Sequence, residues 1–183
     1  NSNTFVVPYD LYQPRLKKIK NEINSDYTIG GTQFPDFIIV EFKKDESGEK
    51  TINFRLVEIK YRGHDISKED VNRILKDQTS RIKDIFNELN AYRTAYSEKN
   101  MWKHTLSIIL SEMYSYYHDN FNTLSSDASL TFNEIINSEY TFQLNDSLLI
   151  AIDGSSEFKS GVVDQGIYFK VPATEIHEVF DCS

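Results

Sequence analysis

The chain has 183 residues, of which 39% are hydrophobic and 13% aromatic, so it can form one domain with a buried core and is not a disordered polypeptide. Its net charge of −8 argues against nucleic-acid binding over its whole surface, because such binding depends on neutralising phosphates. The single cysteine, Cys182, excludes an internal disulfide and a cysteine-based zinc site.

The first predicted element is a helix over residues 10–24. Its apolar stripe comprises Tyr12, Leu16, Ile19 and Ile23. Pro14 falls near the first turn, where a proline is tolerated. Lys17 and Lys18 lie on the basic side of this helix, which is either an ordinary solvated face or a surface that contacts phosphates. Residues 27–31 are expected to form a short strand that ends at two glycines.

The next stretch is predicted to be a β-hairpin, because two runs rich in β-branched and aromatic residues, 34–42 and 51–61, flank a polar segment with a glycine. Side chains alternate between the two faces of a strand, so Glu58 and Lys60 point the same way. Pairing between the two strands can bring Asp36 beside them. The second strand has apolar residues on both faces, which predicts a central position in the sheet.

Two carboxylates and a lysine at the ends of apolar strands need a chemical explanation, because buried acids repel each other unless they are paired or bind a cation. Mg²⁺ and Mn²⁺ prefer oxygen ligands, which Asp36, Glu58 and the backbone carbonyl of Ile59 could supply. Lys60 would then lie beside a metal-bound water. The alternative is that Asp36 begins a turn and that Glu58 and Lys60 form a solvated ion pair.

Pro35-Asp36 followed by Glu58-Ile59-Lys60 resembles the signature of the PD-(D/E)xK nuclease superfamily, which lies on adjacent strands of one sheet. The resemblance implies an α/β fold with a restriction-endonuclease-like core, in which a central mixed sheet is flanked by helices. It also implies an Mg²⁺-dependent (or Mn²⁺-dependent) DNA nuclease that hydrolyses phosphodiester bonds. Many members carry a metal-binding acid on the first helix, for which Glu22 is the candidate here. A surface glutamate is the alternative.

Residues 65–96 are predicted to form a long helix with Ser67 as its N-cap. Gln78 is the one polar member of the inward stripe of this helix, and a buried amide needs hydrogen-bond partners. In RecB-type members of the superfamily, a glutamine on the corresponding helix faces the active site, and Gln78 resembles it. A structural glutamine is the alternative. Arg62 and Lys76 are candidate DNA contacts, although Arg62 could equally be a surface residue at the strand exit.

The second half of the chain is predicted to contain further helices and strands. The predicted helices span residues 101–121 and 130–138, and a polar linker over residues 122–128 separates them. The predicted strands span residues 142–153 and 165–171, and a helical turn follows from Thr174. Tyr114, Tyr116 and Tyr117 either stack on bases or, as is usual for aromatic residues at helical spacing, pack in the core.

The two halves differ in charge. Residues 1–103 carry 18 Lys/Arg and 16 Asp/Glu, a balance of +2, whereas residues 104–183 carry 2 and 12, a balance of −10. We therefore expect any DNA contact to come from the first half, and the acidic half to be solvated or to bind another protein. We expect residues 1–183 to form a single domain, with a catalytic core over 1–100 and a helical, strand-rich, acidic remainder over 101–183.

Parts of the chain also look similar to the nuclease-like module of HerA/FtsK-type ATPases from bacterial DNA-restriction systems, notably phosphorothioation-dependent restriction. The similar segments are VEIKYR, the helix with an internal glutamine, LSIILSEMYSYY and the acidic tail. The similarity implies antiviral defence and an ATPase or translocase in the same or an associated chain, and a homo-oligomer is possible. The alternatives are a degenerate nuclease-fold domain that binds DNA or protein without cleaving, and a protein-interaction module.

The chain begins at Asn1 without a methionine, so we expect it to be a fragment of a larger protein. No run of about 18 apolar residues and no export signal is recognisable in the sequence. We therefore expect no membrane association and a cytoplasmic location.

Overall fold

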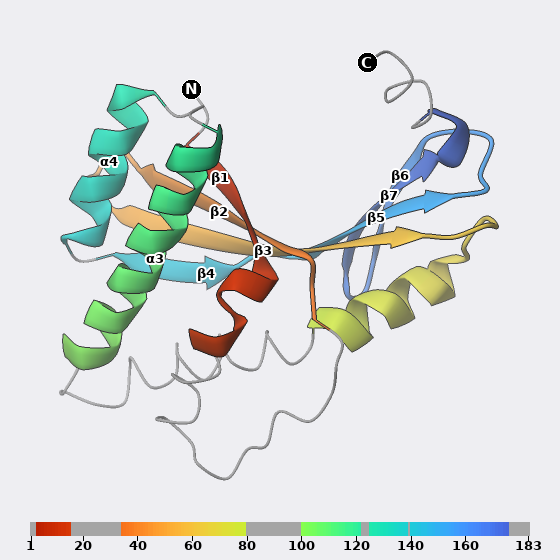
Figure 1. The fold of residues 1–183 in the computed structure, drawn as a ribbon, viewed down its shortest axis with the longest axis horizontal. Helices are drawn as coiled ribbons and strands as arrows, with labels where there is room; N and C mark the ends of the chain where they lie inside the picture. The colour runs from red at the N-terminus through yellow and green to blue at the C-terminus, as the bar shows by residue number, and fades with distance from the viewer. Residues whose placement is uncertain (1–2, 16–33, 80–99, 122–124, 139, 176–183) are drawn as a thin grey trace, which may run out of the picture.

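The computed structural model describes residues 3–15, 34–79, 100–121, 125–138 and 140–175. Within them, seven strands form one mixed sheet that helices flank, so the predicted α/β class is correct (Figure 1). The strands are β1 (Thr4–Pro8), β2 (Phe37–Lys44), β3 (Lys50–Tyr61), β4 (Thr141–Leu144), β5 (Ser147–Asp153), β6 (Lys159–Val163) and β7 (Gly166–Pro172). The helices are the 3₁₀ turn η1 (Tyr9–Leu11), α3 (Asn100–Phe121) and α4 (Ser126–Ile136), with further helical residues at 13–15, 68–79 and 173–175.

The sheet has the strand order β1-β2-β3-β5-β7-β6, and β4 also pairs with β3. The β1–β2, β2–β3 and β6–β7 pairs are antiparallel, whereas β3–β4, β3–β5 and β5–β7 are parallel. β4 pairs with residues 51–54 of β3, and β5 pairs with residues 57–61. β3 is therefore central, as its apolar faces predicted.

The predicted hairpin is present as β2 and β3, which pair from Phe37 opposite Val57 to Lys44 opposite Lys50. In the connecting turn, the Asp45 carboxylate accepts hydrogen bonds from the backbone N–H of Glu49 at 2.9 Å and from the hydroxyl of Ser47 at 2.7 Å. Gly48 has a φ of 87°, a conformation that glycine adopts without steric cost.

Two hydrophobic clusters lie at the two ends of the sheet. In the first, α3 and α4 lie over β1, β2 and β4, and Phe5, Phe42 and Phe132 form its aromatic centre (Figure 1). Tyr114 stacks on Phe132 with a centroid distance of 4.5 Å, so this helix tyrosine packs in the core. In the second cluster, the helical residues 68–79 pack on β5 and β7. Its buried members are Ile66, Val71, Ile74, Leu75, Leu149, Ala151 and Tyr168.

Several element boundaries differ from the predictions. α4 begins at Ser126, inside the predicted linker, because Ser125 caps it by accepting a hydrogen bond from the Ala128 N–H at 3.2 Å. The strand predicted over 142–153 is two strands, since the N–H of Asn145 donates to the Phe54 carbonyl at 2.7 Å and ends the β4 pairing. β1 and β6 were not predicted. Each has five residues, and none of the five residues of β6 is buried.

Some predictions fall outside the described residues. These are the body of the first helix with Lys17, Lys18 and Glu22, the strand over 27–31, the helix after residue 79, and the turn after residue 175. Among the described helices, none is both long enough and apolar enough to cross a membrane.

Candidate functional site

The structure places Asp36 directly beside Glu58. Asp36 precedes β2, and its N–H donates to the carbonyl of Val57 at 2.9 Å. Its carboxylate Oδ2 accepts a hydrogen bond from the N–H of Ile59 at 2.7 Å. Val57 and Ile59 flank Glu58 on β3, so these two hydrogen bonds fix Asp36 next to that residue. Asp36 is itself exposed to solvent.

Glu58 is completely buried, with 0% of its surface exposed. The Lys60 ammonium forms an ion pair with Glu58 Oε1, which confirms that the two side chains share one face of β3. Among the described residues, no backbone amide and no other side chain donates a hydrogen bond to either Glu58 oxygen. Burial raises the pKa of Glu58, the neighbouring Lys60 opposes this rise, and the charge of Asp36 adds to it.

Glu58 is buried because it lies where the two hydrophobic clusters meet. Leu56, two residues earlier on the same face of β3, belongs to the first cluster. Leu149, which pairs with Glu58 on β5, belongs to the second. The alternative of a solvated ion pair is therefore wrong for Glu58, although the Lys60 side chain is 30% exposed.

The chemistry of this cluster fits a hard divalent cation. Among the described residues, the Lys60 ammonium is the one group that pairs with the Glu58 carboxylate, and Asp36 presents one oxygen that the Ile59 N–H does not engage. Carboxylate oxygens are the ligands that Mg²⁺ uses, commonly one or two of them together with substrate phosphate. Within the described part of the chain, no group of three or more His, Cys, Asp or Glu residues is placed to hold a metal. The described residues therefore bring two carboxylates together at this place, and not three.

The other predicted site residues lie around this cluster or outside the described ranges. Gln78 is buried on the helix over 68–79, but no hydrogen bond joins it to Asp36, Glu58 or Lys60. Arg62 follows β3 directly and is exposed, and its N–H donates to the carbonyl of Ile152 at 2.8 Å.

Lys76 is exposed on the same helix as Gln78. Glu22, Lys17 and Lys18 lie outside the described residues. The structure thus gathers the Asp36, Glu58 and Lys60 side chains and leaves both interpretations of Gln78 open.

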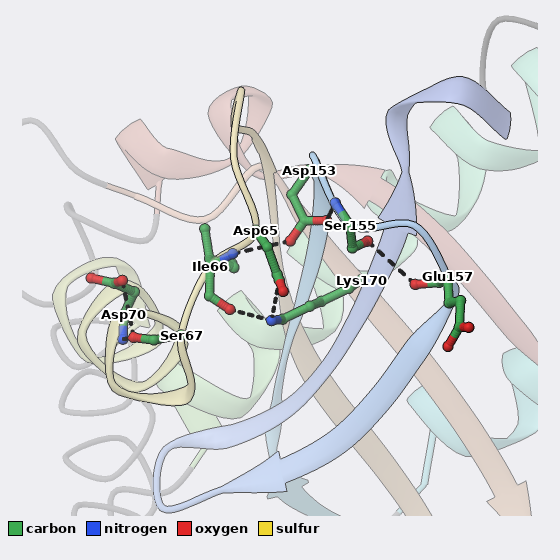
Figure 2. A network of polar contacts seen from close by, with 8 residues as sticks. All are labelled: Asp65, Ile66, Ser67, Asp70, Asp153, Ser155, Glu157 and Lys170. Carbon is green, nitrogen blue, oxygen red and sulfur yellow. Dashed lines mark hydrogen bonds and ion pairs between the residues drawn. The ribbon is translucent and has the colours of Figure 1, made fainter.

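A second polar network fixes the loop that follows the site, and it was not predicted (Figure 2). Lys170 on β7 is 7% exposed, donates to Asp65 Oδ1 at 2.7 Å and contacts the carbonyl of Ile66. Asp153, which ends β5 and is 0% exposed, accepts hydrogen bonds from the N–H groups of Ile66 at 3.3 Å and Ser155 at 2.9 Å. Residues 65 and 66 are therefore tied to the ends of two core strands.

The helix over 68–79 begins directly after this loop. The hydroxyl of Ser67 accepts a hydrogen bond from the Asp70 N–H at 3.1 Å, so the predicted N-cap is correct. Gly154 lies against the loop so closely that a Cβ there would be 3.0 Å from the Cα of His64. The sequence signal for the network was the pair of charged residues, Asp153 and Lys170, in otherwise apolar strands.

Comparisons with known proteins do not assign the site. No family model matches the chain, and neither a curated protein nor a solved structure matches it. The resemblance to the PD-(D/E)xK superfamily therefore rests on the residues of the chain alone.

Proposed function

We propose that this domain is a divalent-metal-dependent nuclease that cleaves DNA, with Asp36, Glu58 and Lys60 as its active-site residues. The observation that carries the proposal is the Glu58 carboxylate, which is fully buried, accepts no hydrogen bond from a backbone amide and lies beside a second carboxylate. Such an arrangement destabilises the free protein and is typical of sites built for a cation or for catalysis.

Glu58, Asp36 and the carbonyl of Ile59 would hold Mg²⁺ or Mn²⁺. When bound, this ion supplies positive charge to a phosphate and lowers the pKa of a coordinated water. The hydrogen bond from the Ile59 N–H to Asp36 Oδ2 fixes the orientation of the Asp36 carboxylate before any ligand arrives. Burial of Glu58 excludes water from its side of the site.

Lys60 would not bind the metal, because its side chain is a cation. In the free protein its ammonium compensates the charge of Glu58. A metal cation at Glu58 would compensate this charge instead. The partly exposed Lys60 could then orient the attacking water or stabilise negative charge on the phosphate. Arg62 and Lys76, both exposed, would contact neighbouring phosphates together with Lys17 and Lys18.

The finer parts of the proposal follow from the family resemblance. Glu22 would be a third acid at the metal and Gln78 a polar residue of the active site. The domain would be the nuclease module of a HerA/FtsK-type ATPase in bacterial restriction, with an ATPase or translocase as its partner.

Cleavage of supercoiled plasmid DNA in Mg²⁺ or Mn²⁺ tests the proposal. We expect nicking or linearisation by the wild-type chain and none by Asp36→Asn, Glu58→Gln or Lys60→Met. The first two variants keep the size of the side chain, and circular dichroism would check that each variant is folded. Glu46→Gln, in the exposed turn between β2 and β3, is the matched control and should cleave normally. Full activity in Asp36→Asn or Glu58→Gln would refute the mechanism.

A second candidate is a nuclease-fold domain that binds DNA or a protein partner without cleaving. The absence of a third metal-binding side chain near Asp36 and Glu58 within the described ranges favours it. Calorimetric titration with Mn²⁺ separates the two candidates. If the domain is a nuclease, the wild type should bind Mn²⁺ and Glu58→Gln should not. If it only binds DNA or a protein, neither should bind Mn²⁺ at this site, and the wild type should change the mobility of DNA or of the partner protein in a native gel.

A further inference from the structure

The face of the sheet opposite Glu58 carries a polar cavity. Its volume is about 220 Å³, and it is lined by Thr4, Ile39, Glu41, Asn53, Arg55 and Asn145. Glu41 pairs with Thr4 on β1 and with Asn53 on β3, so these three side chains form one row across three strands. Asn53 and Arg55 have the opposite parity to Glu58 and therefore point away from the proposed nuclease site.

Asn53 is the most buried of the six residues that line this cavity. It is 4% exposed, and its Nδ2 donates a hydrogen bond to Glu41 Oε2 at 3.2 Å. Its Oδ1 is buried and has no hydrogen-bond partner among the described residues. A buried acceptor without a partner costs free energy, so its presence beside a cavity calls for a ligand that donates a hydrogen bond. The proposed nuclease chemistry makes no use of it.

Two of the side chains that line the cavity, Glu41 and Arg55, are charged. Arg55 pairs with Ile39 across β2 and β3, which makes Glu41 its diagonal neighbour, and such neighbours are roughly 7–8 Å apart. Among the described residues, no ion pair joins Arg55 to Glu41 or either of them to another side chain. A carboxylate and a guanidinium therefore face the same cavity without neutralising each other directly.

We propose that this cavity binds a small zwitterion of the α-amino acid class. Its ammonium group would donate to Asn53 Oδ1 and face the Glu41 carboxylate, and its carboxylate would pair with the Arg55 guanidinium. The Glu41 carboxylate would repel a simple anion, and the Arg55 guanidinium would repel a simple cation. None of the six lining residues is aromatic, so the cavity has no surface for stacking a nucleobase.

Calorimetric titration of the wild-type protein with glycine, L-alanine and L-glutamine tests this proposal. We expect saturable binding of at least one of them with a Kd of about 1 mM or tighter. For the amino acid that binds, the N-acetyl derivative lacks the ammonium and the amide derivative lacks the carboxylate. Both should bind at least about 10-fold more weakly. If none of the three amino acids binds, or if the derivatives bind equally well, the proposal is wrong.

Substitutions of the charged lining residues test whether the amino acid binds in this cavity. Glu41→Gln keeps an acceptor for Asn53 Nδ2 but removes the negative charge from the cavity, and Arg55→Gln removes the positive charge. Each should weaken binding by about 10-fold or more. Glu46→Gln removes an exposed carboxylate outside the cavity and should not change the Kd. Asp36→Asn should also leave binding unchanged, so this result and the test of the nuclease site can fail independently.

Discussion

Glu58 and Asp153 are both fully buried acids at the ends of neighbouring strands of one sheet, yet their surroundings are opposite. Asp153 accepts hydrogen bonds from the N–H groups of Ile66 and Ser155. Glu58 accepts none from the backbone, and burial raises its pKa. Burial of an acid therefore does not by itself indicate a functional site. Burial without a backbone hydrogen bond supports the proposal for Glu58, because the fold usually satisfies a purely structural carboxylate as it does Asp153.

The largest effect that the comparison predicts is on stability. Asp153→Ala leaves the N–H groups of Ile66 and Ser155 without their acceptor in a buried location, so we expect a loss of about 3 kcal/mol in the free energy of unfolding. Urea denaturation followed by circular dichroism measures it. Asp146→Ala, an exposed aspartate just before β5, is the control and should change stability by less than about 0.5 kcal/mol. If the two substitutions lowered the free energy of unfolding equally, the structural role assigned to Asp153 would be wrong.

The second prediction concerns metal. If Mn²⁺ binds at Glu58 in the folded protein and not in the unfolded chain, a concentration of about 100 times the Kd should add about 2.7 kcal/mol to the free energy of unfolding. Thermal unfolding with and without Mn²⁺ measures the gain as an increase in Tm. The increase should be absent in Glu58→Gln and present in Glu46→Gln. An increase that survives in Glu58→Gln would place the metal elsewhere.

The third prediction is that Glu58→Gln is more stable than the wild type in the absence of metal, by about 1 kcal/mol at neutral pH, since it removes a poorly solvated charge. The pKa of Glu58 is higher in the folded state than in the unfolded chain, so the ionised form destabilises the fold. This cost is fully present above the folded-state pKa and fades as the pH falls through it. The difference between the two proteins should therefore shrink on acidification, and a constant difference from neutral pH to pH 4 would contradict the prediction.

The smallest effect is expected for Asp65→Asn. Lys170 holds the pKa of the exposed Asp65 carboxylate below its usual value, so the ion pair stabilises the fold above the unfolded-state pKa and is lost as the pH falls through the lower folded-state pKa. We expect a small decrease in Tm at neutral pH, less than for Asp153→Ala, that disappears at strongly acidic pH. Solvent screens this ion pair because the Asp65 carboxylate is exposed, and Lys170 retains the Ile66 carbonyl. A decrease as large as that of Asp153→Ala would mean that the ion pair, not the Asp153 carboxylate, holds the loop.

The hairpin and the common face of Glu58 and Lys60 could be predicted because both depend on local patterns, namely β-branched runs and the two-residue period of a strand. The central position of β3 followed from apolar residues on both of its faces. β1 was missed because a five-residue strand near the start of the chain gives too short a pattern to separate from an irregular segment.

The burial of Glu58 and the role of Asp153 could not be predicted, because both depend on contacts between distant parts of the chain. Glu58 is covered through pairing with Leu149, and Asp153 binds the N–H of Ile66, 87 positions away. The hydrogen bond from Ile59 to the Asp36 side chain requires a specific rotamer, which no periodic pattern encodes.

β3 receives two successive parallel partners along one edge, β4 beside residues 51–54 and β5 beside residues 57–61. It also pairs with β2 along the other edge. Sliding β3 by one residue would turn every one of its side chains to the opposite face and would break three pairings at once. The backbone that presents Glu58 therefore has a single available register. The proposed binding of a metal at this carboxylate would then require movement of side chains, chiefly of Lys60, and no movement of the strand.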